Sequence, residues 1–259
     1  MVKIDSVSMK FPLPKRYREY FLSTKKTKHF KALDDVTLNI DEGDRVAFLG
    51  VNGAGKTTLL KLIGGLLYPS SGSIEVNGYD TTSNNSKSRK NVGFVLNEER
   101  SFYWRLTAVQ NLEFFGVLDN LKGLDLTNRI NKLIELVGLD LAKFKEVASY
   151  SSGMKQRLAM ARGLLCDPKI LILDEPTRAL DPQAVQDMKN LISRKIHEDK
   201  QRTLLIATHR FDEVEELCNK VCVMQDGKLI SYNSINEIRS HYKSVEQYYH
   251  EKMNIRITN

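Results

Sequence analysis

Cysteine is scarce in this chain, and its placement excludes a disulfide framework. The 259 residues include three cysteines, Cys166, Cys218 and Cys222. Such usage is typical of proteins kept in a reducing compartment. Cys218 and Cys222 are four residues apart, a spacing that allows them to share one face of a helix, but no histidine or second cysteine pair completes a zinc site. We therefore expect structural roles for these cysteines.

Long hydrophobic runs are also missing. No apolar run approaches the roughly 20 residues that a membrane-spanning helix needs, and the longest, such as residues 170–173, have the length of buried strands. The first eleven residues, MVKIDSVSMKF, are interrupted by charge at once and do not resemble a secretory signal. These absences predict a soluble, cytoplasmic protein unless a partner holds it at a membrane.

Internal repeats and low-complexity tracts are absent as well, and the composition is that of a globular protein. Hydrophobic residues make up 41% of the chain, enough for a full core. The net charge of +7 is unevenly spread, because residues 15–31 hold seven lysines and arginines against one acid, Glu19. A basic stretch of this kind can meet nucleic acid, anionic lipid or an acidic partner, and it can equally be a solvated loop.

Apolar segments of strand length alternate with segments of helical spacing. We expect helices from Lys56 and over residues 182–196, a loop over 83–90, and strands over residues 2–9, 35–40, 45–49, 72–76, 92–96, 170–173, 204–207 and 221–224. Residues 107–165 show helical spacing and no clear strand. This order predicts an α/β fold with a largely parallel sheet, covered by helices on both faces and interrupted by a helical insertion.

A glycine-rich segment between an expected strand and an expected helix fits the phosphate-binding pattern G-x-x-x-x-G-K-[ST]. Its backbone N–H groups would point at phosphate oxygens beside the positive end of the helix. Lys56 would reach the β- and γ-phosphates, and the Thr57 hydroxyl would bind Mg²⁺. The expected nucleotide-binding residues in this phosphate loop are Gly50, Asn52, Gly53, Ala54, Gly55, Lys56, Thr57 and Thr58.

A buried strand over residues 170–173 ends in the acidic pair Asp174 and Glu175, followed by Pro176. Alone, the pair could be two solvated carboxylates at a strand end. Next to a phosphate loop, Asp174 is positioned to join the Mg²⁺ shell, usually through water. Glu175 points elsewhere and could polarise the water that attacks the γ-phosphate.

Further motifs resemble the ABC (ATP-binding cassette) ATPase family. Residues 150–157, Tyr-Ser-Ser-Gly-Met-Lys-Gln-Arg, are similar to the family signature L-S-G-G-Q, with Tyr150, Ser152 and Met154 replacing its Leu, first Gly and Gln. The resemblance implies that Ser151, Ser152 and Gly153, at the start of a helix, bind the γ-phosphate held by a second subunit. A helix N-terminus suits that role because its N–H groups attract anions.

Two more segments follow in the family's order. Residues 178–181, Arg-Ala-Leu-Asp, resemble the loop that crosses the dimer interface, and residues 207–209, Ala-Thr-His, match the switch histidine. By this resemblance His209 hydrogen-bonds the γ-phosphate and organises the catalytic water. The resemblance covers roughly residues 2–229, most of the chain.

The sequence departs from the family at two places. Asn97 stands where the family has a glutamine that binds Mg²⁺; it could bind the metal directly or through water, and Glu98 is the alternative donor. The aromatic residue that stacks on adenine is also open. Phe11 lies at the usual distance along the first strand, but the insertion over residues 12–31 makes Tyr17 and Phe30 rivals.

The resemblance implies a P-loop NTPase core with an antiparallel β subdomain and an inserted α-helical subdomain at about residues 98–165. Residues 1–231 would form the ATPase domain and 232–259 a short helical tail. ATP and Mg²⁺ would be the cofactors. Two copies would close around two ATP molecules, and an integral membrane permease would hold the protein on the inner face of the cell membrane.

The cargo is less well specified. The basic insertion and the Tyr-Ser-Ser-Gly-Met segment resemble the ATPases of capsule, O-antigen and teichoic-acid exporters, which favours export of a glycan or glycolipid. Residues 154–157 and 97–100 also suit exporters of drugs, antibiotics or lipids. Soluble family members that act on ribosomes or DNA carry two cassettes or a long coiled coil. This chain has neither, so we expect no nucleic acid partner. Intact Lys56, Asp174, Glu175 and His209 argue against a non-hydrolysing cassette.

Overall fold

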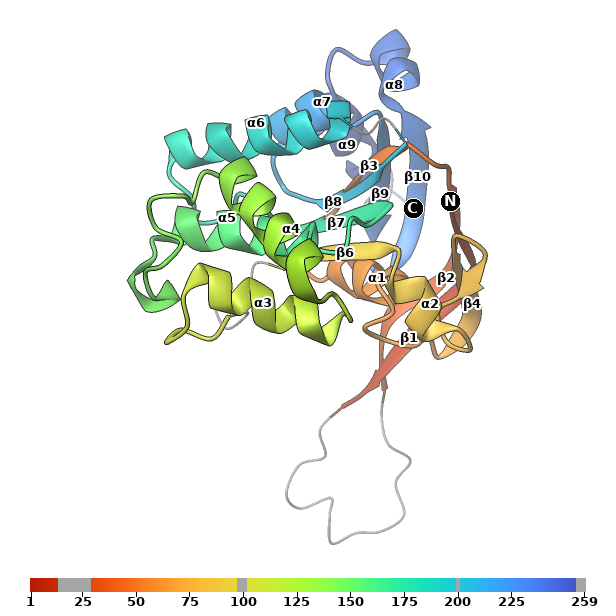
Figure 1. Cartoon of the computed structure of the whole chain (residues 1–259). Coiled ribbons are helices and arrows are strands. Elements are labelled where there is room, and N and C mark those ends of the chain that lie inside the picture. The colour runs from red at the N-terminus through yellow and green to blue at the C-terminus, as the bar shows by residue number, and fades with distance from the viewer. Residues whose placement is uncertain (14–28, 97–101, 199–200, 255–259) are drawn as a thin grey trace, which may run out of the picture.

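The computed structural model describes residues 1–13, 29–96, 102–198 and 201–254 (Figure 1). Within these residues a six-stranded sheet has the order β10-β9-β3-β8-β7-β6. All its neighbours pair in parallel except β10, which is antiparallel to β9. Its strands are β3 (Arg45–Leu49), β6 (Val92–Leu96), β7 (Ile170–Asp174), β8 (Thr203–Ala207), β9 (Lys220–Gln225) and β10 (Lys228–Ser234).

A second, antiparallel sheet has the order β2-β1-β4-β5. Val2 lies opposite Ile40, and Ile4 opposite Leu38, so one face of β1 and β2 carries buried aliphatic side chains. These strands are β1 (Val2–Pro12), β2 (His29–Ile40), β4 (Ser71–Val76) and β5 (Tyr79–Asp80).

Alternation along the central strands divides the interior into two cores, because successive side chains of a strand point to opposite faces. Ala47 and Leu49 of β3 pack with the helices of the insertion. Val46 and Phe48 pack with the antiparallel sheet and the helix α1 (Lys56–Ile63). The central sheet is therefore buried on both faces, as a parallel sheet requires.

The helices lie on either side of this sheet, with α3, α4 and α5 grouped away from the antiparallel sheet (Figure 1). Among the described helices, none is both long and apolar enough to cross a membrane. They are α1 (Lys56–Ile63), α2 (Asn85–Arg89), α3 (Ala108–Leu118), α4 (Gly123–Leu136), α5 (Ser152–Gly163), α6 (Pro182–Glu198), α7 (Phe211–Leu217), α8 (Ile235–His241) and α9 (Val245–Asn254), with a 3-10 turn at Val147–Ser149.

The predicted fold class is confirmed, and four local expectations are corrected. The second strand begins at His29, not at residue 35. Residues 83–90 contain the helix α2, held by side chains and not by apolar periodicity: Asn85 donates to the backbone oxygens of Gly65 and Thr81, both at 2.9 Å. Strand β10 was not expected, although Asp226 and Gly227 form the positive-φ turn typical of a hairpin.

The fourth correction concerns the cysteines. Cys218 ends α7 and Cys222 lies within β9, so the two do not share a helix face. Both are buried thiols, and burial raises the pKa of each. No group of three or more potential metal ligands from His, Cys, Asp and Glu occurs among the described residues.

Candidate active site

The phosphate loop joins the end of β3 to α1 and is shaped by close backbone contacts. Gly55 has φ of 101°, and a Cβ there would lie 2.8 Å from the backbone oxygen of Ala32. Gly53 has φ of 84°, and a Cβ there would meet nothing within 4 Å. Asn52 and Gly53 are exposed while Ala54 is buried. The loop is thus packed tightly at Gly55 and open to solvent at Asn52 and Gly53. Of the two threonines that follow Lys56, Thr57 is exposed and Thr58 is half-buried.

Lys56 begins α1 and turns back into the loop. Its side chain is buried, and Nζ donates to the backbone oxygens of Gly50 at 2.6 Å and Val51 at 3.1 Å. Burial lowers the pKa of Lys56, while the charges of Glu175 and Asp174 act in the opposite direction. The loop therefore holds an ammonium group at its centre, within the electrostatic range of two carboxylates.

Asp174 ends β7 directly beside the loop. The Thr57 hydroxyl donates to Asp174 Oδ1 at 3.0 Å. Burial raises the pKa of Asp174; the Thr57 bond lowers it, and the charge of Glu175 adds to the rise. A hydroxyl and a carboxylate oxygen this close are the hard oxygen donors that Mg²⁺ uses when it takes few protein ligands. The residues present therefore fit a magnesium ion. Asn97 and Glu98, the other expected metal donors, lie outside the described residues.

Glu175 and His209 meet across the ends of β7 and β8. His209 Nε2 lies 3.1 Å from Glu175 Oε1. The backbone N–H of Glu175 donates to the Ala207 oxygen at 2.8 Å, and Glu175 has a left-handed φ of 50°, which is uncommon for a residue with a side chain. Both side chains remain partly accessible, at 21% for Glu175 and 43% for His209. A carboxylate and an imidazole in this arrangement can together orient and deprotonate a water molecule.

The loop after the acidic pair brings in a contact that the sequence did not predict. Arg178 NH1 lies 3.2 Å from Glu175 Oε2. Asp181, at the other end of residues 178–181, accepts a hydrogen bond from the backbone N–H of Ala184 at 3.0 Å. The arginine at position 178, where the family has a serine, is the only sequence feature that could have indicated the contact between Arg178 and Glu175.

The signature residues begin α5. Ser151 caps this helix, accepting from the Met154 N–H at 3.2 Å, and Ser151 and Ser152 are exposed. Ser151 and Gly153 line an open hollow together with residues 138–142 and the start of α6, and no phosphate-loop residue lines it. Tyr150 is buried, and its hydroxyl donates to the Ala142 oxygen at 2.8 Å, so the replacement of the family's leucine has a structural reason.

Two of the three candidate adenine-stacking residues are described. Phe11 is half-buried and lies directly opposite Phe30 in the β1–β2 pairing, and Phe30 is 52% exposed. Directly opposed residues of an antiparallel pair project from the same face. Tyr17 lies outside the described residues, as does residue range 14–28 of the basic insertion.

Comparisons with known proteins identify the family and the fold. A family model described as "ABC transporter" matches residues 33–178. The chain is 36% identical to the ABC transporter ATP-binding protein NatA of Bacillus subtilis, over 86% of this chain and 90% of NatA. It is 40% identical to the bacitracin transport ATP-binding protein BcrA of Bacillus licheniformis, over 77% of this chain and 64% of BcrA. Its fold resembles a dimeric ATP-binding cassette, MJ0796, bound to ADP and phosphate, with a TM-score of 0.77, 25% identity, and coverage of 91% and 99% of the two chains.

Proposed function

This chain belongs to the ABC transporter family as an ATP-hydrolysing subunit, and from that premise we propose that the site above binds Mg–ATP and hydrolyses it between two copies of the chain. The observation that carries the proposal is the contact of 3.1 Å between Glu175 and His209 beside the buried Lys56. Glu175 and His209 are in contact, and the charge of Glu175 acts on Lys56, so three groups with different tasks in γ-phosphate hydrolysis share one region.

Each described residue has a task in this proposal. The phosphate-loop N–H groups and Lys56 bind the phosphates, and Lys56 offsets the charge that develops on the γ-phosphate. Thr57 and Asp174 would hold Mg²⁺, which supplies neutralisation of the phosphate oxygens when bound. Glu175 accepts a proton from the attacking water, and His209 aligns that water with the γ-phosphate. Phe11 is our candidate for stacking on adenine, with Phe30 as its neighbour.

We propose that the site is composite. In one chain Ser151 and Gly153 at the start of α5 line a hollow that contains no phosphate-loop residue, and Ser152 beside them is exposed. These serines and Gly153 would therefore serve the γ-phosphate held by a second copy. The dimeric state of the MJ0796 cassette bound to ADP and phosphate supports this arrangement. Two ATP molecules between two copies would make closure depend on binding and opening depend on hydrolysis.

The proposed division of the chain is an ATPase domain over residues 1–231, with its helical subdomain at about 98–165, and a tail over 232–259. Strand β10 spans the boundary between the ATPase domain and the tail. The tail helix α9 is anchored on α7, with the ring centroids of Phe211 and Tyr249 separated by 5.5 Å. We propose that a membrane permease binds the dimer and holds it at the inner face of the cell membrane.

For the cargo, we propose export of a drug, antibiotic or lipid ahead of export of a glycan. The 40% identity to a bacitracin transport protein supports the first class. Export of a glycan is supported by the signature segment and by the basic insertion, and most of that insertion is outside the described residues. Deleting the gene tests both: increased sensitivity to bacitracin-like peptides supports the first class, and loss of surface polysaccharide supports the second.

The catalytic assignment is tested by phosphate release from Glu175→Gln and His209→Ala. We expect each to bind ATP like the wild type and to lose at least about 100-fold in kcat, the range of one general acid–base group. Glu216→Gln, the same chemical change on α7 at a residue that pairs with Lys189, is the matched control and should hydrolyse normally. Hydrolysis by Glu175→Gln at the wild-type rate would show that Glu175 is not the general base.

A further inference from the structure

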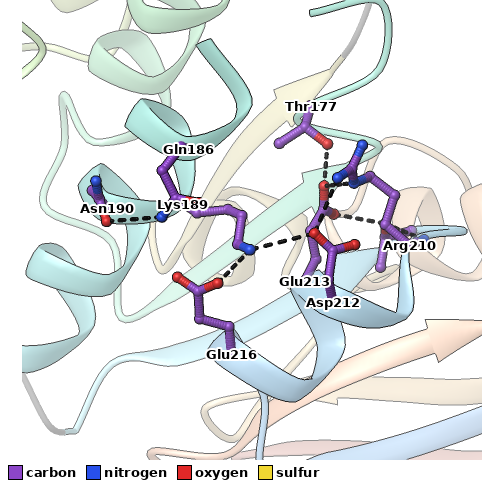
Figure 2. A network of polar contacts seen from close by, with 9 residues as sticks. Thr177, Gln186, Lys189, Asn190, Arg210, Asp212, Glu213 and Glu216 are labelled. Atoms are coloured by element: carbon purple, nitrogen blue, oxygen red, sulfur yellow. Dashed lines mark hydrogen bonds and ion pairs between the residues drawn. The ribbon is translucent and has the colours of Figure 1, made fainter. Parts of the chain in front are cut away.

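A buried carboxylate joins the two loops that carry Glu175 and His209. Glu213 lies in the first turn of α7 and is fully buried. Its Oε1 accepts a hydrogen bond from the Thr177 hydroxyl, and its Oε2 accepts one from the Thr208 hydroxyl at 2.6 Å. Figure 2 shows the Glu213 carboxylate between the loop of Thr177 and the loop of Arg210.

The two threonines are close in sequence to the proposed catalytic pair. Thr177 follows Glu175 by two residues, and Thr208 directly precedes His209. Thr208 is itself held a second time, because its hydroxyl accepts from the Arg210 N–H at 3.0 Å. One side chain from a third element therefore links the segments after β7 and β8.

Packing alone does not require a carboxylate at this position. Val214 and Leu217 already bury the inner face of α7. Burying an ionised carboxylate is costly unless it is fully bonded, and a buried ionic group is often no more stabilising than an apolar one of similar size. Burial indeed raises the pKa of Glu213, while the two threonines and Arg210, whose Nε lies 3.3 Å from Oε1, act against that rise. The costly group is placed where two catalytic loops meet.

We propose that Glu213 is a positioning residue for hydrolysis: by holding Thr177 and Thr208 it fixes the distance and orientation of Glu175 and His209. This inference rests on the catalytic roles proposed above for that pair. Reacting groups must be aligned closely, and a displacement near 1 Å can cost on the order of 100-fold in rate. The Glu213 carboxylate contacts Thr177, Thr208 and Arg210, and none of these belongs to the phosphate loop, so nucleotide binding should be independent of it.

The first test compares three variants that keep side-chain size. Glu213→Gln replaces the carboxylate by an amide, and Thr177→Val and Thr208→Val each remove one of its hydroxyl partners. Single-turnover phosphate release should fall roughly 10-fold or more in each, while the Kd for ATP stays within about twofold. Glu216→Gln is the control. If Glu213→Gln fails to fold, Thr208→Val carries the test. A merely structural role would lower Tm and leave the kcat of the folded protein unchanged, which overturns the proposal.

A double-mutant cycle with His209→Ala separates positioning from an independent effect. Without the imidazole only Glu175 remains to be positioned, so Glu213→Gln should then cost less than it does in the wild-type background. Equal losses in both backgrounds would overturn the proposal. If His209→Ala shows no measurable rate, Thr177→Val replaces it in the cycle. Full activity of Glu175→Gln and His209→Ala would instead overturn the proposed function, whereas their inactivity beside a fully active Glu213→Gln overturns this inference alone.

Discussion

At the scale of single residues, the site depends on charged groups that are only partly exposed. Lys56 is enclosed by the backbone of its own loop, and its ammonium group donates to two carbonyl oxygens. Holding this group in place before phosphates arrive reduces the reorganisation that binding needs. The same enclosure means that a substitution at Lys56 removes both a phosphate partner and an internal tie of the loop.

Lys56→Ala should weaken ATP binding by roughly 10- to 100-fold, the range of one hydrogen bond to a charged group. Fluorescence titration with a labelled ATP analogue measures the effect. Lys90→Ala removes an exposed lysine near the end of α2 and should bind like the wild type. Equal affinity of the two variants would contradict the role given to Lys56.

Thr57→Val should leave Mg²⁺-free nucleotide binding nearly unchanged and raise the Mg²⁺ concentration needed for half-maximal hydrolysis. The reason is that the variant removes one of the two oxygen donors that lie 3.0 Å apart. Hydrolysis measured against Mg²⁺ at saturating ATP gives the result. An unchanged Mg²⁺ dependence would show that Thr57 does not bind the metal.

The residue-scale site was largely predictable because its residues sit in contiguous motifs. Lys56, Asp174 and His209 each follow a predicted strand, and strand order alone brings their ends to one edge of a parallel sheet. Glu213 and Thr177 were not predictable. Their contact joins residues 36 apart in sequence, and nothing in the sequence around Glu213 indicates that its carboxylate is buried.

At the scale of elements, an ion cluster ties the helical insertion to the central sheet. Asp167, between α5 and β7, lies 3.1 Å from Arg129 of α4 and 2.8 Å from Arg202, which precedes β8. Arg129 also donates to the backbone oxygens of Leu164 and Leu165, at 2.9 and 3.2 Å. The end of α5 is therefore fixed to both α4 and the sheet.

Asp167→Asn should lower Tm near neutral pH, and the loss should diminish in acid. Burial tends to raise the pKa of Asp167, but the bonds and charges of Arg129 and Arg202 hold it below the ordinary value. A carboxyl whose pKa is lower in the folded state than in the unfolded state stabilises the protein at every pH above the unfolded-state pKa. That stabilisation is lost as the pH falls through the folded-state pKa. The Tm difference should be constant from about pH 5 to 8 and narrow below about pH 4.

Asparagine is the right replacement because Asp167 has a left-handed φ of 50°, which asparagine tolerates. Glu113→Gln, at an exposed position in the middle of α3, is the control that removes one negative charge away from this cluster. A Tm difference that is the same at every pH would contradict the electrostatic explanation.

Elements with strong apolar periodicity were predicted, and elements held by polar or turn chemistry were not. The strand β8 is buried throughout, and its sequence shows it. Helix α2 depends on the Asn85 side chain, which bonds to backbone oxygens at Gly65 and Thr81. Such hydrogen bonds produce no apolar periodicity in a polar sequence, so the sequence predicted a loop over residues 83–90.

At the scale of the whole molecule, the two halves of the proposed site do not line a common hollow in one chain. The phosphate loop lies at the end of β3, and the signature residues begin α5, where they line a hollow with the start of α6. The relative position of these two halves could not be predicted from the sequence, because the orientation of the helical insertion depends on tertiary packing. Closure of two copies is what would bring the halves together.

The most direct measurement is sedimentation of Glu175→Gln with saturating Mg–ATP, with and without Gly153→Asp in the same chain. A Cβ at Gly153 would be in ordinary van der Waals contact with the Ala184 Cβ, 3.5 Å away, so the second change adds negative charge without a clash at the Cβ. We predict a stable dimer for Glu175→Gln, and a monomer that still binds ATP for the double variant. A monomeric Glu175→Gln, or a double variant that still dimerises, would contradict a site shared between two copies.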